Sequence, residues 1–160
     1  MGIEIERKFR VRGDAWRAAA HQRTLLRQGY LANTAHASVR VRIAGDRGWL
    51  SVKAMTPGLS RAEYEYPVPV AEAEALLRLC DSPLLEKWRH LVRHAGDEWE
   101  IDEFLGDNAG LVIAELELAR EDQPFERPDW LGEEVTQQER FYNFRLAQHP
   151  FRHWPQESVA

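Results

Sequence analysis

The 160-residue sequence has almost no cysteine and no long apolar run, and both absences narrow its possible roles. Cys80 is the only cysteine, so an intramolecular disulfide and a thiolate metal cluster are both excluded. So little cysteine is typical of a protein kept in a reducing cytoplasm. No apolar stretch approaches the roughly 18 residues that a membrane-spanning helix requires. The N-terminus is charged from Glu4 onward, so no signal peptide is expected. We therefore expect a cytoplasmic protein without a membrane partner.

The sequence also has fewer basic residues than acidic ones. Lysines and arginines number 21 against 26 aspartates and glutamates, which gives a net charge of −5 and a pI near 5.7. Generic nucleic-acid binders usually carry a basic excess, so no nucleic-acid partner is expected. Hydrophobic residues make up 44% of the chain and charged residues 29%, as in a folded globular domain. We expect one domain over residues 1–148 and a C-terminal tail, with two prolines, over residues 149–160.

Strand signals dominate the chain. Alternating apolar and polar residues, separated by turn sequences, predict eight strands over residues 3–11, 25–32, 38–44, 48–54, 61–69, 84–93, 98–105 and 112–119. The short connections between most of them favour antiparallel hairpins over βαβ units. Helices are expected over residues 16–22 with Asp14 as N-cap, over AEAEALLRL after Pro69, and over residues 134–147. The expected fold is α+β and mainly β.

Charged residues recur at every second position along these strands, mostly as pairs of one sign. The acidic members are Glu4, Glu6, Glu63, Glu65, Glu100, Asp102, Glu115 and Glu117, and the basic members are Lys8, Arg40, Arg42, Lys53, Lys87 and Arg89. Side chains alternate across a strand, so each pair lies on one face about 7 Å apart. A solvated sheet face is one explanation, but such a face usually mixes both signs with neutral polar residues. Like charges in proximity are unfavourable without a counter-charge, so the repeated pattern favours a face that binds ligands of both signs.

Closing the eight strands into a barrel would place this charged face inside. Eight-stranded barrels have an interior wide enough for about one small ligand. Carboxylates without histidine or cysteine among them suit Mg²⁺ or Mn²⁺, whereas guanidinium and ammonium groups suit phosphate oxygens. We expect a closed eight-stranded antiparallel β-barrel with a charged interior, helices packed outside, and a site for a metal–polyphosphate complex. A charged interior argues against a carrier of apolar ligands.

The N-terminal stretch IEIERKF resembles the E-x-E-x-K signature of the CYTH superfamily, the triphosphate tunnel metalloenzymes. Further segments agree in order along nearly the whole chain: RQGYL at 27–31, SVRVR at 38–42, LSVK at 50–53, SRAEYEY at 60–66, EKWR at 86–89, EIDEF at 100–104, AELEL at 114–118 and LGEEVT at 131–136. The small single-domain bacterial branch, whose members mostly favour inorganic triphosphate, looks most similar. The resemblance implies a tunnel that binds a linear polyphosphate and hydrolyses triphosphate to pyrophosphate and phosphate with a divalent metal.

The resemblance also implies roles for individual residues. The family's metal carboxylates match Glu4, Glu6, Glu115 and Glu117, with Asp102, Glu63 and Glu65 nearby, and two Mg²⁺ or Mn²⁺ ions are expected. Its phosphate-holding cations match Lys8, Arg40, Arg42, Lys53 and Arg89. Lys87 matches a lysine near the scissile phosphate, and Tyr30 matches a tyrosine implicated in substrate choice. Arg140 is expected to add a cation from the C-terminal helix, although residues 138–141 read QERF where the family commonly has D-x-R-Y or D-K-R-Y.

Two other hypotheses stay open. One is a nucleotide-using member of the same family, either a nucleoside or thiamine triphosphatase or an adenylate cyclase. A cyclase would need base and ribose contacts at the tunnel mouth, and no segment clearly supplies them. The other is a module that binds polyphosphate or a nucleotide without cleaving it. A homodimer is compatible with each hypothesis, and metal-dependent turnover distinguishes the enzymes from the binding module.

Overall fold

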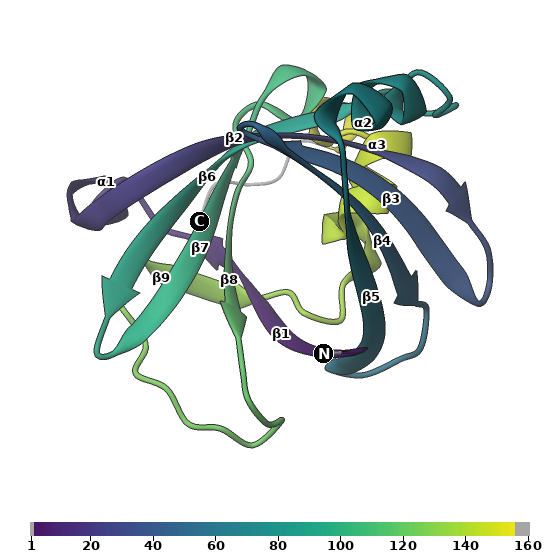
Figure 1. Cartoon of the computed structure of the whole chain (residues 1–160). Helices are drawn as coiled ribbons and strands as arrows, with labels where there is room; N and C mark the ends of the chain where they lie inside the picture. Colours follow the sequence, from purple (N-terminus) through teal and green to yellow (C-terminus); the bar gives the residue numbers. More distant parts are fainter. Residues whose placement is uncertain (1, 156–160) are drawn as a thin grey trace.

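Nine strands form one antiparallel sheet in the computed structural model, which describes residues 2–155 (Figure 1). They are β1 (Gly2–Val11), β2 (Ala20–Asn33), β3 (Ala37–Ala44), β4 (Arg47–Ala54), β5 (Ser60–Val68), β6 (Leu85–His94), β7 (Asp97–Phe104), β8 (Val112–Glu117) and β9 (Leu131–Glu134). Their order in the sheet is β5-β4-β3-β2-β6-β7-β8-β1-β9, and β1 also pairs with β5. That pairing closes eight strands into a barrel, which confirms the predicted fold and leaves β9 as an additional strand beside β1.

Strand β1 closes the barrel by dividing its length between partners. Residues 2–5 pair with β5, residues 6–10 pair with β8, and the end of the strand pairs with β9. The register with β8 sets Glu6 opposite Glu117 and Lys8 opposite Glu115. Hydrogen bonding along the closing strand therefore fixes which charges of β1 and β8 stand side by side.

The helix predicted over residues 16–22 is wrong in length. Helix α1 spans only Trp16–Ala19, and β2 begins at Ala20. The reason is β6, which pairs with β2 from Ala20 to Gln28 and so offers a long ladder that outweighs a weak helix preference. Asp14 is not a helix cap either, because its carboxylate accepts a hydrogen bond from Arg17 Nε at 3.2 Å and makes no cap bond.

The helix predicted after Pro69 is confirmed as α2 (Val70–Leu77), which lies on the outside of the barrel (Figure 1). Its buried residues Ala73 and Leu77 pack against Val41 and Ile43 of β3. These two positions of β3 alternate with charged ones, so the strand presents an apolar face outward and a charged face inward. Among the residues that the structure describes, no helix is long and apolar enough to cross a lipid bilayer.

The single helix predicted over residues 134–147 is wrong. The segment instead contains the end of β9, the 3₁₀ turn η2 (Glu139–Phe141) and the short helix α3 (Asn143–Gln148). Glu134 pairs with Phe9 of β1, and the backbone N–H of Val135 donates to the carbonyl of Lys8. These pairings to β1 hold the first residues of the segment extended, so helix formation is delayed until Asn143.

The chain beyond α3 remains in contact with the barrel. Turn η3 (Phe151–His153) follows, and the backbone N–H of Phe151 donates to Asn108 Oδ1 at 2.9 Å, in turn η1 (Gly106–Asn108). Trp154 packs edge-on against Phe141 with ring centroids 5.1 Å apart. The domain boundary at residue 148 stays a prediction, and residues 156–160 of the predicted tail lie outside the described part of the chain.

One end of the barrel interior is apolar rather than charged. Leu85, Phe104 and Ile113 share the inward faces of their strands with charged neighbours two residues away. They form a buried cluster with Phe141 and Leu146 of the C-terminal segment. The structure therefore refines the prediction of outside helices, because α2 covers the outer wall whereas η2 and α3 close one end of the interior.

At Gly48, α2 packs closely against the barrel. A Cβ at this position would lie 2.8 Å from the Cβ of Ala73 and 2.8 Å from the carbonyl oxygen of Val68. One of these atoms is backbone, so Gly48→Ala forces α2 or β5 to shift. We expect a loss of about 1–3 kcal/mol in the free energy of unfolding, measured by urea titration. The exposed neighbour Arg47 provides a control, since Arg47→Ala should cost less than about 0.5 kcal/mol. Equal midpoints for the two variants would contradict the tight contact.

Candidate active site

A cavity of about 480 Å³ occupies the barrel interior, and charged side chains line it from several strands. Its acidic lining is Glu4, Glu6, Glu63, Glu65, Glu100, Glu115 and Glu117, and its basic lining is Lys8, Arg40, Arg42, Lys53, Arg61 and Arg89. The structure thus brings together most of the site residues that the sequence predicted. Their alternation with apolar residues is the reason, since it directs one face of each strand inward.

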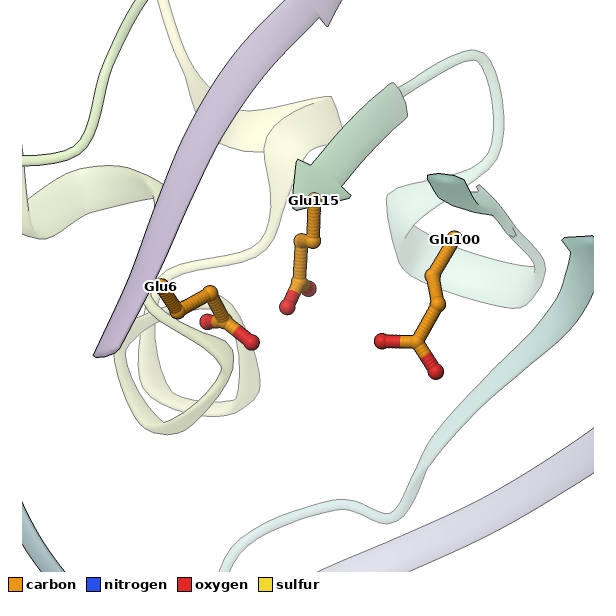
Figure 2. Close-up of side chains that lie close together, drawn as sticks. All are labelled: Glu6, Glu100 and Glu115. Atoms are coloured by element: carbon orange, nitrogen blue, oxygen red, sulfur yellow. The ribbon is translucent and has the colours of Figure 1, made fainter. Parts of the chain in front are cut away.

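Three carboxylates meet at one point of this cavity. Glu6 of β1, Glu100 of β7 and Glu115 of β8 point toward a common space, and one oxygen of each lies within 4.8 Å of the others (Figure 2). Burial and then the charges of Glu115 and Glu4 raise the pKa of Glu6 well above its ordinary value. Burial also raises the pKa of Glu100.

The third member of this cluster behaves differently. Burial opposes ionisation of Glu115, but Lys8 and then Arg89 hold its pKa well below the ordinary value. An ionised Glu115 thus faces two carboxyls that ionise at a cost, and a divalent cation among them would remove that cost. The donors are hard oxygen atoms from three separate strands, with no sulfur or imidazole among them. This donor set fits Mg²⁺ or Mn²⁺.

Lys53 lies among three of the remaining acidic residues of the lining, Glu4, Glu63 and Glu117. Its Nζ lies 2.5 Å from Glu4 and 3.8 Å from Glu63. Burial opposes protonation of Lys53, but Glu6 and Glu4 raise its pKa to about 12. Burial and then Glu4 raise the pKa of Glu63 and of Glu117. These carboxylates face the cavity but lie outside the three-carboxylate cluster, and Glu65 is paired with Arg40 at 3.5 Å. Their predicted role as metal ligands stays a prediction.

A group of arginines forms a second feature of the lining. Arg42 Nε donates to Gln28 Oε1 at 2.8 Å, and Arg40 Nη2 donates to Ser51 Oγ at 3.1 Å. Burial, with Arg40 and Arg89 nearby, lowers the pKa of Arg42 to about 9. Arg40 Nε is buried without a hydrogen-bond partner among residues 2–155. Buried like charges and an unused donor are both unfavourable, and a bound polyanion would compensate for both.

Lys87 and Asp102 lie at the closed end of the interior, where both side chains are fully buried. Lys87 Nζ is 2.6 Å from Asp102 and donates to Asn143 Oδ1 at 3.0 Å. Burial lowers the pKa of Lys87 to about 8, with Arg89 and Arg42 acting in the same direction. Burial opposes ionisation of Asp102, but Arg89 and Lys87 hold its pKa below the ordinary value.

Asp102 therefore holds cations in place, rather than joining the carboxylate cluster as the sequence had suggested. It accepts two hydrogen bonds from Arg89, at 2.8 and 2.9 Å, besides its pairing with Lys87. Tyr30 is close to fully buried, lines the cavity from β2, and packs edge-on against Phe144 at 6.3 Å. Tyr30 thus lies on the cavity wall, and its predicted role in substrate choice stays a prediction.

The structure does not bring Arg140 into the cavity. Its guanidinium lies over the rings of Phe141 and Trp154, 4.9 and 4.5 Å from their centroids, on the exposed side of η2. Sequence reasoning also missed Arg61, which lines the cavity and donates to the hydroxyl of Tyr142 at 3.1 Å. The signal was available, because Arg61 stands two residues before Glu63 and so shares its face.

The CYTH domain model matches residues 2–147 of the chain. The chain belongs to the CYTH family. The inorganic triphosphatase of Acetivibrio thermocellus is 48% identical to this CYTH domain protein over 155 residues, which cover 96% of this chain and 99% of the relative. The inorganic triphosphatase of Nitrosomonas europaea is 36% identical over 148 residues, covering 90% of this chain and 96% of the relative. The crystal structure of the inorganic triphosphatase NE1496 superposes with a TM-score of 0.66 at 34% identity, over 90% of this chain and 97% of that one.

Proposed function

We propose that this chain is an inorganic triphosphatase, which hydrolyses linear triphosphate to pyrophosphate and phosphate inside the barrel. The observation that carries the proposal is the mixture of charges in the cavity wall. Three convergent carboxylates lie beside arginines of β3 and β6, and Arg89 contacts two of them, Glu100 at 3.2 Å and Glu115 at 3.6 Å. A metal–polyphosphate complex has charges of both signs and so fits such a wall. Two relatives in the family carry the same name, which supports the choice of inorganic triphosphate.

The carboxylate cluster is the proposed metal centre. Glu6, Glu100 and Glu115 would hold Mg²⁺ or Mn²⁺, for which their oxygen donors are suited. When bound, such an ion neutralises charge on phosphate oxygens and lowers the pKa of a bound water. A second ion near Glu4, Glu63 and Glu117 is part of the proposal and is supported by the three carboxylates that line the cavity there.

The cations of the cavity bind and orient the substrate in this proposal. Arg40, Arg42 and Arg89 offer guanidinium groups to successive phosphates, and Lys8, Lys53 and Arg61 extend the row. Arg89 is kept in place by its two hydrogen bonds to Asp102. In phosphoryl transfer, positioning and electrostatic stabilisation supply most of the rate enhancement. Cations held in fixed positions provide both for the transferring phosphoryl group.

Lys87 is the proposed catalytic cation at the scissile phosphate. It is fully buried, and its pKa of about 8 keeps much of it protonated at neutral pH. Two of its three N–H groups are directed to Asp102 and Asn143. The third N–H is then available for an oxygen that gains charge in the transition state. Tyr30 is proposed to influence which substrates are cleaved, from its place on the cavity wall.

Phosphate release from triphosphate, ATP and pyrophosphate, each with Mg²⁺, Mn²⁺ or EDTA, tests this function. We expect fast cleavage of triphosphate with either metal, slow cleavage of the other two substrates, and no cleavage in EDTA, because the carboxylate cluster needs a cation to act. ATP cleavage as fast as that of triphosphate would favour a nucleotide-using enzyme. Tight binding of triphosphate without cleavage would instead indicate a binding module. A cytoplasmic location and a homodimer stay predictions beside this proposal.

A further inference from the structure

Asn143, the first residue of α3, connects the C-terminal segment to the interior of the barrel. It lines the cavity, and its Oδ1 accepts a hydrogen bond from Lys87 Nζ at 3.0 Å. An ammonium group has donors and no acceptor, so the oxygen of the amide is the atom that must face Lys87. The hydrogen bond therefore establishes that the oxygen of the Asn143 amide, and not its nitrogen, faces Lys87.

Lys87 needs this second contact to have a defined position. A lysine side chain has four rotatable bonds, and a single ion pair leaves the ammonium several ways to point. Asp102 supplies the first anchor at 2.6 Å, but it is shared with Arg89, which donates two hydrogen bonds to the same carboxylate. Asn143 supplies the other anchor, from a different part of the chain. With two N–H groups held by Asp102 and Asn143, the direction of the third N–H of Lys87 is fixed.

Asn143 is itself held firmly enough to act as an anchor. Its neighbours Phe141 and Leu146 are buried in the apolar cluster that closes the interior. The hydroxyl of Tyr142 donates to the carbonyl of Thr136 at 3.1 Å and accepts from Arg61 at the same distance. The backbone on both sides of Asn143 is thus fixed to the barrel.

We propose that Asn143 is a positioning residue, whose side-chain oxygen orients the Lys87 ammonium toward the oxygen that gains charge at the scissile phosphate. The inference rests on the proposed triphosphatase function, because it assigns Asn143 to the same reaction. It gives the C-terminal helix a direct part in turnover, although its contact with Lys87 is through a neutral amide. The proposal gives Asn143 no part in substrate binding, which is assigned to the arginines of β3 and β6.

The sharpest test is a double-mutant cycle between Asn143 and Lys87. Asn143→Ala should lower kcat for triphosphate about tenfold, the effect of losing one hydrogen bond to a charged group, with a much smaller change in KM. In a Lys87→Ala background the same substitution should have no further effect on kcat. Gln148→Ala, an exposed position on the same helix, is the matched control and should leave both constants unchanged. Multiplicative losses in the double variant would overturn the proposal.

A conservative variant guards against a general loss of structure. Asn143→Asp keeps an oxygen facing Lys87, so its kcat should be well above that of Asn143→Ala, even if the added charge raises KM by repelling triphosphate. Equal kcat values for the two variants would overturn the proposal.

A spectroscopic readout separates this inference from the proposed function. In the substrate-free protein, the buried ammonium of Lys87 should give a ¹⁵N-detected NMR signal that exchanges slowly with water and is assigned by its loss in Lys87→Ala. Asn143→Ala should shift this signal and speed its exchange. A changed signal in an enzyme that does not cleave triphosphate would refute the function and leave the contact standing. An unchanged signal in an enzyme that does cleave triphosphate would refute the positioning role alone.

Discussion

Lys87→Ala is expected to lower kcat for triphosphate hydrolysis by about 10²- to 10³-fold, with a much smaller change in KM. The physical reason is that Lys87, fully buried beside the lining residues Arg89 and Asn143, is proposed to stabilise the charge that develops at the scissile phosphate. The lining cations that are proposed to bind the substrate are all kept in this variant. Steady-state kinetics with saturating Mg²⁺ measures both constants.

The fold should survive this substitution. Asp102 would lose one partner but would keep two hydrogen bonds to Arg89, so it would not be left as an unpaired buried charge. Thermal unfolding provides the check, and Arg78→Ala, an exposed position just beyond α2, is the control with unchanged kinetics. Losses of equal size in kcat and in substrate affinity would contradict the assignment of Lys87 to the chemical step.

Glu115→Gln should reduce activity at a fixed, low Mg²⁺ concentration by at least about 100-fold. Glu115 is the ionised member of the carboxylate cluster, and the amide keeps its size while removing the charge. Part of the loss should be recovered at high Mg²⁺, because Glu6 and Glu100 remain. Activity measured against Mg²⁺ concentration gives the shift in the metal requirement.

Glu115→Gln should weaken metal binding but should not weaken metal-free binding of triphosphate. Lys8 and Arg89 lie close to Glu115, and removing its charge leaves both cations less compensated. Triphosphate binding in EDTA, measured by calorimetry, should therefore be as tight as in the unmodified protein or tighter. Glu72→Gln on the outer helix α2 is the control for both experiments. Weaker triphosphate binding together with an unchanged metal requirement would contradict a metal-holding role for Glu115.

The barrel and its charged interior could be predicted from the sequence because both follow from a period of two. A strand directs alternate residues to opposite faces, so Glu4 and Glu6, or Arg40 and Arg42, must share a side. Arg61 obeys the same rule and lines the cavity, but it differs in sign from Glu63 and so falls outside the pattern of like-signed pairs.

What the sequence could not supply is the pairing between distant residues. Asp102 has the same spacing from Glu100 as Glu4 has from Glu6, yet in the folded chain it faces Lys87 and Arg89. The strand register decides this, and register is set by the whole sheet rather than by local sequence. The contact between Lys87 and Asn143 spans 56 residues and has no local pattern at all.

The predicted boundaries of two helices were wrong for a related reason. Residues 20–22 and Glu134 have acceptable helix preferences, but each lies beside a strand that pairs with it. A ladder to β6 or β1 outweighs a helix preference of a few tenths of a kcal/mol per residue. Arg140 was misplaced with them, since the break in the expected helix turns its side chain away from the cavity and over the rings of Phe141 and Trp154.

Phosphorus NMR of the reaction with inorganic triphosphate tests the central claim most directly. With Mg²⁺ present, the triphosphate signals should disappear while pyrophosphate and orthophosphate appear in equal amounts, and the pyrophosphate should then persist. With EDTA, the triphosphate signals should stay constant, because the carboxylate cluster of Glu6, Glu100 and Glu115 would have no cation to hold. Unchanged triphosphate in the presence of Mg²⁺, or cleavage that continues at the same rate in EDTA, would contradict the account of a metal-dependent triphosphatase.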